Sequence, residues 1–272
     1  YHVLHETHYD YGSAVSLSQQ QLHLSPRILA WQHCSEHRLE IEPTPTWQRY
    51  GSDPFGNPVV WLAFDKPHDH LWVRSEMTVE VVPHLPLMPL AESMPWDVLR
   101  ERLAYDACPP LREDLDAARF LFESPFVRVK HEFRAYAIDC FPPGTPVLVG
   151  VKALMRKIFT EFDFDPEATS VSTPVMEVLA NKRGVCQDFA HLMIACLRSL
   201  GLAARYVSGY LLTHPPPGKP RLIGADASHA WVSVYCPGVG DDWVDFDPTN
   251  NLLPDTQHIT VAFGRDFGDI SP

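Results

Sequence analysis

Hydrophobic and polar residues alternate along the early part of the chain, which is the pattern of half-buried β-strands. The clearest example is the segment 37–43, where Leu39 and Ile41 fall on one face and charged residues on the other. Turn-forming residues separate such runs, most densely at 53–58. Several short strands at this spacing are typical of an antiparallel β-sandwich. We therefore predict a β-rich, antiparallel β-sandwich-like module over residues 1–85.

The pattern changes after a proline-rich stretch at 83–95, which makes this stretch the predicted domain boundary. Apolar residues at helical spacing then predict three helices, at 96–105, 111–122 and 147–162. Strand patterns return nearer the C-terminus, at 203–212, 228–235 and 243–249. Residues 86–272 are therefore expected to form a second domain, in which helices precede strands.

A helical pattern begins at Cys186. From this residue, apolar or small side chains recur at the spacing of one buried helix face, at Ala190, Met193, Ile194, Leu197 and Leu200. Gly201 then ends the helix. A thiol at a helix start faces unpaired backbone N–H groups and the positive end of the helix dipole, which favour a thiolate and can bind an oxyanion. Cys186 is thus a candidate nucleophile, with a buried structural cysteine as the alternative.

Two residues further along the chain can complete a thiol-based site. His229 and Asp247 lie on strand patterns joined by one short turn, which suits an antiparallel pair with cross-strand side chains about 5 Å apart. A carboxylate in that position can orient an imidazole that exchanges protons with a thiol. A packed strand histidine and a turn-forming Asp-Pro-Thr sequence are the alternatives. The order of the three residues, each on a suitable element, favours the catalytic interpretation.

The segments around these residues resemble the transglutaminase-like family, at 183–190, 205–210, 228–232 and 243–249. Segments at both ends of the chain resemble the bacterial members of that family, at 1–7, 24–27, 55–58 and 258–267. The resemblance implies an α+β fold. In this fold a β-rich N-terminal module precedes a papain-like, transglutaminase-like core, with the nucleophile at a helix N-terminus.

The resemblance also implies roles for individual residues. Cys186 would be the nucleophile, His229 the general base and acid, and Asp247 the group that orients the imidazole. Asp245 is a competing carboxylate on the same strand face. We select Asp247 because the family pattern places the orienting residue directly before Pro-Thr.

Two polar residues of the Cys186 helix are expected to lie away from the site. Asp188 lies about 200° around the helix from Cys186, so we expect a structural role, for example pairing with Arg183 or Arg205. His191, five positions after the nucleophile, projects in another direction.

The composition of the chain limits the classes of partner that it is expected to bind. The chain has 22 Lys and Arg residues against 34 Asp and Glu residues, a net charge of −12 with neutral histidines. Such an acidic balance argues against nucleic acid or an anionic membrane as a partner, and no apolar run reaches transmembrane length. The six cysteines are scattered without a C-x-x-C pair, so we expect reduced thiols and a cytoplasmic location.

Neither a metal nor a cofactor is expected. The segment 162–166 resembles a calcium loop at first sight, but it lacks the glycine, the loop length and the closing glutamate. No two histidines share a helix face at four-residue spacing, which disfavours a metal-dependent hydrolase.

The expected function is cysteine-dependent hydrolysis of an amide bond in a peptide or protein substrate, through a thioester intermediate. This is the activity of a transglutaminase-like cysteine protease or amidase with a Cys-His-Asp triad. Transfer of a glutamine acyl group to an amine would use the same three residues and is the first alternative. A catalytically inactive peptide-binding module is the second, although family members of that kind usually lack the cysteine or the histidine.

Overall fold

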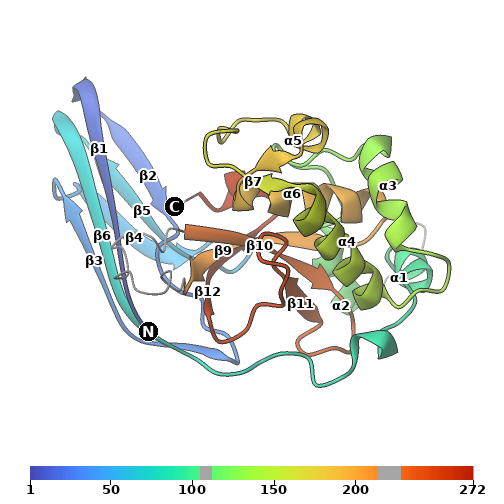
Figure 1. Cartoon of the computed structure of the whole chain (residues 1–272). Coiled ribbons are helices and arrows are strands. Elements are labelled where there is room, and N and C mark those ends of the chain that lie inside the picture. Colours follow the sequence, from blue (N-terminus) through green and yellow to red (C-terminus); the bar gives the residue numbers. More distant parts are fainter. Residues whose placement is uncertain (105–111, 213–227, 272) are drawn as a thin grey trace, which may run out of the picture.

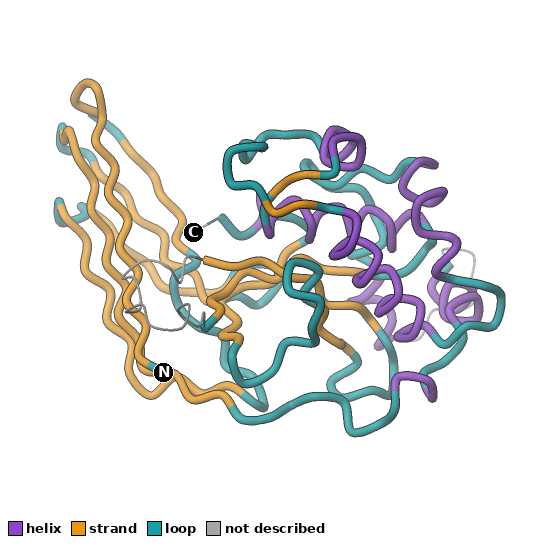
Figure 2. The backbone as a smooth tube through the Cα atoms, viewed as in Figure 1, coloured by secondary structure: helices purple, strands orange, loops and turns teal. Residues whose placement is uncertain are grey.

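The computed structural model describes residues 1–104, 112–212 and 228–271 of the chain. Strands of the N-terminal region lie on one side of the molecule, and helices gather on the other side, beyond a central sheet (Figure 1). Figure 2 shows the same separation between a strand-rich part and a part that mixes helices and strands. The predicted α+β class is therefore confirmed.

The N-terminal region contains two three-stranded antiparallel sheets. The first has the order β1 (His2–Val15), β6 (His68–Val81) and β3 (Gln32–Glu42). The second has the order β2 (Ser18–Leu22), β5 (Pro58–Phe64) and β4 (Trp47–Ser52). One cluster of buried apolar side chains joins the two sheets, formed by Leu22, Leu24, Val60, Leu62, Phe64, Leu71 and Val73. The alternation of apolar and polar residues along the strands therefore produces the predicted sandwich-like arrangement, in which the apolar face of each sheet is turned toward the other sheet.

The remainder of the described chain combines helices with a four-stranded antiparallel sheet. The helices are α1 (Trp96–Leu103), α2 (Arg112–Ala118), α3 (His131–Ala137), α4 (Val147–Glu161), α5 (Val175–Asn181) and α6 (Cys186–Ser199). The sheet has the order β11 (Trp243–Phe246), β10 (Ser228–Tyr235), β9 (Ala204–Leu211) and β12 (His258–Gly264). Smaller elements are η1 (Leu90–Glu92), η2 (Ile138–Cys140), η3 (Phe267–Asp269) and the parallel pair β7 (Asp163–Phe164) and β8 (Arg183–Gly184).

Helix α6 is the centre of this part of the fold. It packs on β9 and β10 on one side and on α3, α4 and α5 on the other. All of its residues from 188 to 198 are buried. A helix enclosed on all sides cannot tilt or slide without opening cavities, and each buried large apolar side chain stabilises its position by roughly 1.5–3 kcal/mol. The N-terminus of α6 is therefore held rigidly against the sheet.

The N-terminal sheets meet the core at β12, the edge strand of the core sheet. A register shift after Thr260 turns the backbone groups of both Thr260 and Phe263 away from β9. The side-chain amides of Gln32 and Asn57 pair with these groups. Asn57, which is fully buried, donates to the carbonyl oxygen of Phe263 at 2.7 Å and accepts its N–H at 2.8 Å. The N-terminal sheets thus fix the outer edge of the core sheet.

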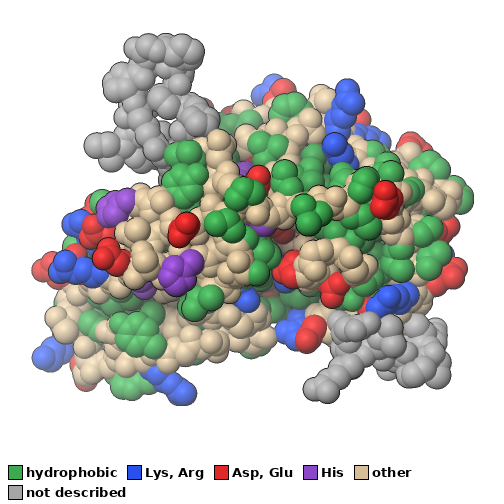
Figure 3. Space-filling model, turned by 90° about the horizontal axis from the view of Figure 1, so that it is seen from below, with side chains coloured by type: hydrophobic (Ala, Val, Ile, Leu, Met, Phe, Trp, Pro, Cys, Tyr) green, Lys and Arg blue, Asp and Glu red, His purple; other side chains and the backbone are tan. Residues whose placement is uncertain are grey.

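The surface carries charges of both signs. Acidic and basic side chains are interspersed on the face of the molecule in Figure 3, with hydrophobic side chains between them. Among the described residues, no helix is both long and apolar enough to cross a membrane. The five described cysteines (Cys34, Cys140, Cys186, Cys196 and Cys236) are free, and Cys108 lies outside the described residues.

Candidate active site

Cys186 is the first residue of α6, and its side chain is half-buried. The helix start is held by Asp188, whose Oδ2 accepts the N–H of Val185 at 2.9 Å and the hydroxyl of Thr169 at 2.6 Å. A side-chain acceptor at this position satisfies a backbone donor that the helix leaves open. The side chain of Asp188 fits in this position because residue 184 is glycine; a Cβ atom there would lie 2.6 Å from Oδ2 of Asp188. The thiol therefore stands at a fixed helix N-terminus.

The expected pairing of Asp188 with Arg183 or Arg205 is wrong, although the structural role is correct. Arg183 is largely exposed, and its closest ion pair is with Asp165 at 3.9 Å. Arg205 lies over two aromatic rings, 4.0 and 3.6 Å from their centres. Burial raises the pKa of Asp188, whereas the hydrogen bonds from Thr169 and Val185 lower it. The N–H of Val185 and the hydroxyl of Thr169, rather than a guanidinium group, donate hydrogen bonds to this carboxylate.

His229 and Asp247 are adjacent, and both are buried, with exposed fractions of 9% and 0%. His229 is the second residue of β10, and Asp247 directly follows the last residue of β11. Nε2 of His229 lies 2.8 Å from Oδ2 of Asp247. The other oxygen, Oδ1, accepts the backbone N–H groups of Thr249 and Asn250 at 2.9 and 3.2 Å. Asp247 therefore acts as a turn former and a histidine partner at once, so the two interpretations of its sequence do not exclude each other.

The structure also brings His229 together with Cys186. Burial by itself lowers the pKa of His229, but hydrogen bonds to Asp247 and Cys186, together with their charges, outweigh it and raise the pKa to about 9. Burial likewise favours the neutral form of Asp247, yet hydrogen bonds from the surrounding donors, His229 first, hold the pKa of Asp247 below its ordinary value. The site thus favours a charged imidazolium beside an ionised carboxylate near neutral pH. Because Nε2 faces Asp247, Nδ1 is the nitrogen available to the thiol.

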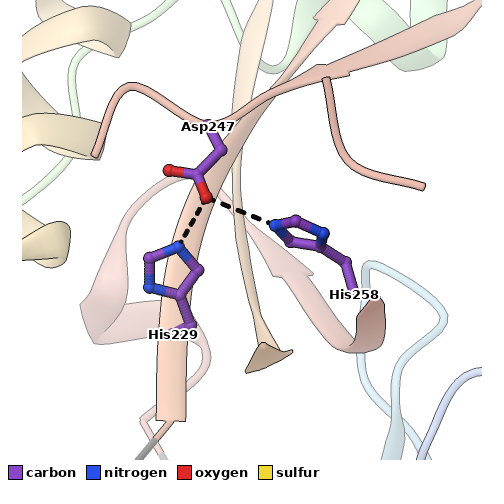
Figure 4. A group of neighbouring side chains, drawn as sticks. All are labelled: His229, Asp247 and His258. Atoms are coloured by element: carbon purple, nitrogen blue, oxygen red, sulfur yellow. Dashed lines mark hydrogen bonds and ion pairs between the residues drawn. The ribbon is translucent and has the colours of Figure 1, made fainter. Parts of the chain in front are cut away.

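Two further side chains reach the Asp247 carboxylate, and the sequence pattern indicated neither. Nε2 of His258, the first residue of β12, lies 3.2 Å from Oδ2 of Asp247 (Figure 4). Nδ2 of Asn250 donates to the same oxygen at 2.7 Å. His258 begins an apolar strand in the sequence, which is the pattern of a packed core residue. Its proximity to Asp247 depends on β12 pairing with β9, and local periodicity carries no information about that pairing.

The donor atoms of His229, Asp247 and His258 all lie within 4.8 Å of one another, close enough for a shared metal ion. Among the described ranges, this is the one group of three or more potential ligands with such geometry. However, the 2.8 and 3.2 Å separations from Oδ2 to the two Nε2 atoms are ordinary hydrogen-bond lengths. We therefore interpret the group as a hydrogen-bonded network around a carboxylate.

Two residues that competed for a role in the sequence lie elsewhere. Oδ2 of Asp245 accepts the indole N–H of Trp231 at 2.9 Å. His191 is buried in α6, where Nε2 accepts the N–H of Phe267 at 3.1 Å. Burial lowers the pKa of His191 to about 4 despite the nearby charge of Asp266, so this imidazole is neutral near pH 7. Asp245 and His191 therefore support the fold around the site.

Comparisons with known proteins cover most of the chain. Residues 1–80 match the bacterial transglutaminase-like N-terminal region, and residues 134–248 match the transglutaminase-like superfamily. An uncharacterized protein of Mycobacterium tuberculosis (strain H37Rv) is 39% identical over 276 residues, which cover 100% of this chain and 85% of that protein. An uncharacterized protein of Mycobacterium leprae is 32% identical over 273 residues, which cover 99% and 90% of the two chains.

Two further similarities involve proteins with a named activity. A protein-glutamine gamma-glutamyltransferase of Pseudomonas aeruginosa is 31% identical over 112 residues, 38% of this chain and 16% of that protein. The fold is similar to a crystal structure from Cytophaga hutchinsonii, of a protein provisionally named a cysteine protease, with a TM-score of 0.72. That match has 20% identity and covers 100% of this chain and 86% of the other. The two family matches, together with the relatives that align over nearly the whole chain, show that the chain belongs to the transglutaminase-like superfamily, among the members that carry the bacterial transglutaminase-like N-terminal region.

Proposed function

We propose that this protein hydrolyses an amide bond in a peptide or protein substrate, with Cys186 as nucleophile, His229 as general base and acid, and Asp247 as the residue that orients the imidazole. The observation that carries the proposal is the chain of contacts from Asp247 through His229 to Cys186, at the N-terminus of a buried helix. A thiol, an imidazole and an orienting carboxylate in that order are the groups that nucleophilic acyl chemistry needs.

The first half of the reaction transfers the acyl group to sulfur. The thiolate of Cys186 attacks the carbonyl carbon, a C–S bond forms, and the carbonyl π electrons move to the oxygen. Backbone N–H groups at the start of α6 stabilise the resulting oxyanion. The C–N bond then breaks, and the imidazolium of His229 gives its proton to the leaving nitrogen. A thioester on Cys186 and a free amine are the products.

The second half returns the enzyme to its starting state. Neutral His229 takes a proton from water, and the hydroxyl oxygen attacks the thioester carbonyl. Breakage of the C–S bond releases a carboxylic acid and regenerates the thiolate beside the imidazolium. A pKa of about 9 for His229 supports this cycle, because the imidazolium is then the dominant form near neutral pH and stabilises the adjacent thiolate.

Transfer of the acyl group to an amine is the second candidate. It differs from hydrolysis only in the acceptor of the thioester. The 31% identity to a protein-glutamine gamma-glutamyltransferase over 112 residues favours keeping it. We place hydrolysis first, because water is always present as an acceptor and does not need a binding site for an amine.

The test begins with the reactivity of the thiol. The full chain is treated with iodoacetamide between about pH 6 and about pH 9, and labelling of each cysteine is followed by mass spectrometry. Cys34 is the internal control, since it is also half-buried and burial raises the pKa of its thiol. We expect Cys186 to react at least about 100-fold faster than Cys34 near pH 7, and we expect His229→Ala to abolish the difference. Equal labelling of the two cysteines would contradict a catalytic thiol and favour a peptide-binding module.

The acceptor is then identified with a library of glutamine-containing peptides, with and without an added primary amine. Cleaved or deamidated peptide in both conditions supports hydrolysis. Incorporation of the amine as the main product would replace hydrolysis with acyl transfer. The Cys186→Ala variant is the control for both products.

A further inference from the structure

The Asp247 carboxylate has more hydrogen-bond donors than a catalytic pair requires. We propose that His258 is a positioning residue of this site, which donates its Nε2–H to the same oxygen that holds His229 and thereby limits how strongly Asp247 binds the imidazolium. This inference rests on the proposed function, because it assigns a role relative to the thiol and imidazole named there. His258 would touch neither the substrate nor the sulfur, and it would act only through Asp247.

Several hydrogen-bond donors compete for the carboxylate oxygens of Asp247. Oδ2 of Asp247 accepts from Nε2 of His229 at 2.8 Å, from Nδ2 of Asn250 at 2.7 Å and from Nε2 of His258 at 3.2 Å. Oδ1 accepts two backbone N–H groups. An ionised carboxylate offers about four lone-pair sites, so five donors must share them. Each donor that approaches Oδ2 therefore weakens the hydrogen bonds that the other donors make to the same oxygen.

The protonation of His258 follows from the same contacts. An ionised carboxylate can only accept hydrogen bonds, and the network keeps Asp247 ionised by holding its pKa low. The Nε2 atom of His258 that faces it must therefore carry a hydrogen. Figure 4 shows the two imidazole rings approaching Oδ2 from different strands, with the carboxylate between them.

The position of His258 is fixed by its surroundings. Its side chain is 4% exposed, and its ring meets the Trp231 ring edge-on, with centres 5.2 Å apart and planes at 80°. Gly209 of β9 makes this contact feasible, because a Cβ atom there would lie 2.5 Å from the Trp231 ring. Two residues further along β12, both backbone groups of Thr260 are bound by Gln32. A side chain held in this way cannot swing away from Asp247 without disturbing two neighbouring strands.

Among the residues that the structure describes, the titratable groups that face His229 are Cys186 from the start of α6, Asp247 after β11 and His258 from β12. Loss of the His258 donor would leave Oδ2 with fewer partners and a stronger interaction with His229. The imidazolium of His229 would then persist to higher pH. A purely structural role for His258 predicts no such movement, because packing alone does not alter the number of donors on the carboxylate.

The test uses two variants of the full chain. His258→Phe keeps a ring of similar size but removes the donor, whereas His258→Gln keeps an amide N–H. The titration of His229 is followed by NMR of protein with ¹⁵N-labelled histidine, with circular dichroism as the check of folding. We expect the His229 midpoint to rise by about half a pH unit or more in His258→Phe and to stay near the parent value in His258→Gln. An unchanged or lower midpoint in a folded His258→Phe variant would overturn the proposal, and so would an equal shift in both variants.

A measurement on the parent protein keeps the proposal testable if His258→Phe does not fold. The ¹⁵N shifts of His258 report which ring nitrogen carries the hydrogen. A protonated Nε2 supports the proposal, and an unprotonated Nε2 overturns it. Neither NMR experiment requires a reactive thiol, so failure of this inference is separate from failure of the proposed function, which is decided by the labelling of Cys186.

Discussion

The side-chain amide of Gln32 binds both backbone groups of Thr260 at the outer edge of β12. Nε2 donates to the carbonyl oxygen at 2.7 Å, and Oε1 accepts the N–H at 2.7 Å. Gln32 belongs to the N-terminal sheets, and Thr260 lies two residues from His258. A side chain of the N-terminal sheets thus makes the hydrogen bonds to β12 that a neighbouring strand would otherwise make.

This relationship predicts that Gln32→Leu destabilises the protein. Leucine has a similar size but leaves the N–H of Thr260 buried without an acceptor, at roughly 1–3 kcal/mol. It also removes the hydrogen bonds from Gln32 to the carbonyl oxygens of Thr260 and Arg27, although the N–H of Arg27 still donates to Thr260 at 3.2 Å. We expect the free energy of unfolding to fall by about 2–4 kcal/mol, measured by urea denaturation. Gln19→Leu is the control, because Gln19 is exposed on β2 and its replacement should change stability by less than about 0.5 kcal/mol. Equal effects of the two substitutions would contradict a special role for Gln32.

The two carboxylates near the end of β11 are expected to behave differently. Asp247→Asn keeps the shape of the side chain, but it removes the charge that stabilises the imidazolium of His229 and allows the wrong tautomer. We expect the rate of Cys186 alkylation near pH 7 to fall at least about 100-fold. Asp245→Asn should stay within about threefold of the parent, since Asp245 binds Trp231 rather than His229. A larger loss in Asp245→Asn than in Asp247→Asn would reverse our choice between the two residues.

The raised pKa of His229 predicts how stability depends on pH. The folded protein binds the His229 proton more tightly than the unfolded chain does, because the pKa is about 9 in the fold and about 6.5 in an unfolded chain. The stabilisation from this group is therefore complete below about pH 6.5 and is lost as the pH rises through about 9. We expect the stability difference between the parent and His229→Gln to shrink by on the order of 2–3 kcal/mol between pH 6 and pH 10.

Urea unfolding curves for the two proteins at several pH values would measure this difference. Taking the difference removes the contribution of the other titrating groups, which both proteins share. A difference that stays constant over the whole range would mean that His229 has an ordinary pKa in the folded state.

Gly184 is expected to be intolerant of a side chain, although it is not at a positive φ angle. A Cβ atom would lie 2.6 Å from Oδ2 and 2.9 Å from Cβ of Asp188, a residue anchored by two hydrogen bonds at the start of α6. We expect Gly184→Ala to destabilise the protein by about 1–3 kcal/mol and to slow Cys186 labelling, because the helix start must shift. Gly12→Ala is the control, since nothing lies within 4 Å of a Cβ atom there. Thermal unfolding of the two variants would show whether they differ as expected.

Local patterns in the sequence were sufficient to predict the secondary structure on which the candidate site residues lie. The helical period that starts at Cys186 placed the thiol at a helix N-terminus, and the strand patterns around His229 and Asp247 placed them on adjacent antiparallel strands. The preference for Asp247 over Asp245 came from the resemblance to the transglutaminase-like family, and it agrees with the 2.8 Å contact to His229. The placement of the thiol at a helix start and of His229 on a strand succeeds because periodicity and turn length describe neighbours that are close along the chain.

Other features were decided only by the tertiary structure. From the sequence we expected Asp188 to pair with an arginine, whereas its carboxylate accepts the N–H of Val185 and the hydroxyl of Thr169. It gave no role to His258, which reaches Asp247 because β12 pairs with β9. Periodicity fixes which face of an element is buried, but it does not specify which distant element covers that face. The partners of a buried polar group are set by strand order and helix packing, and these depend on contacts spread over the whole chain.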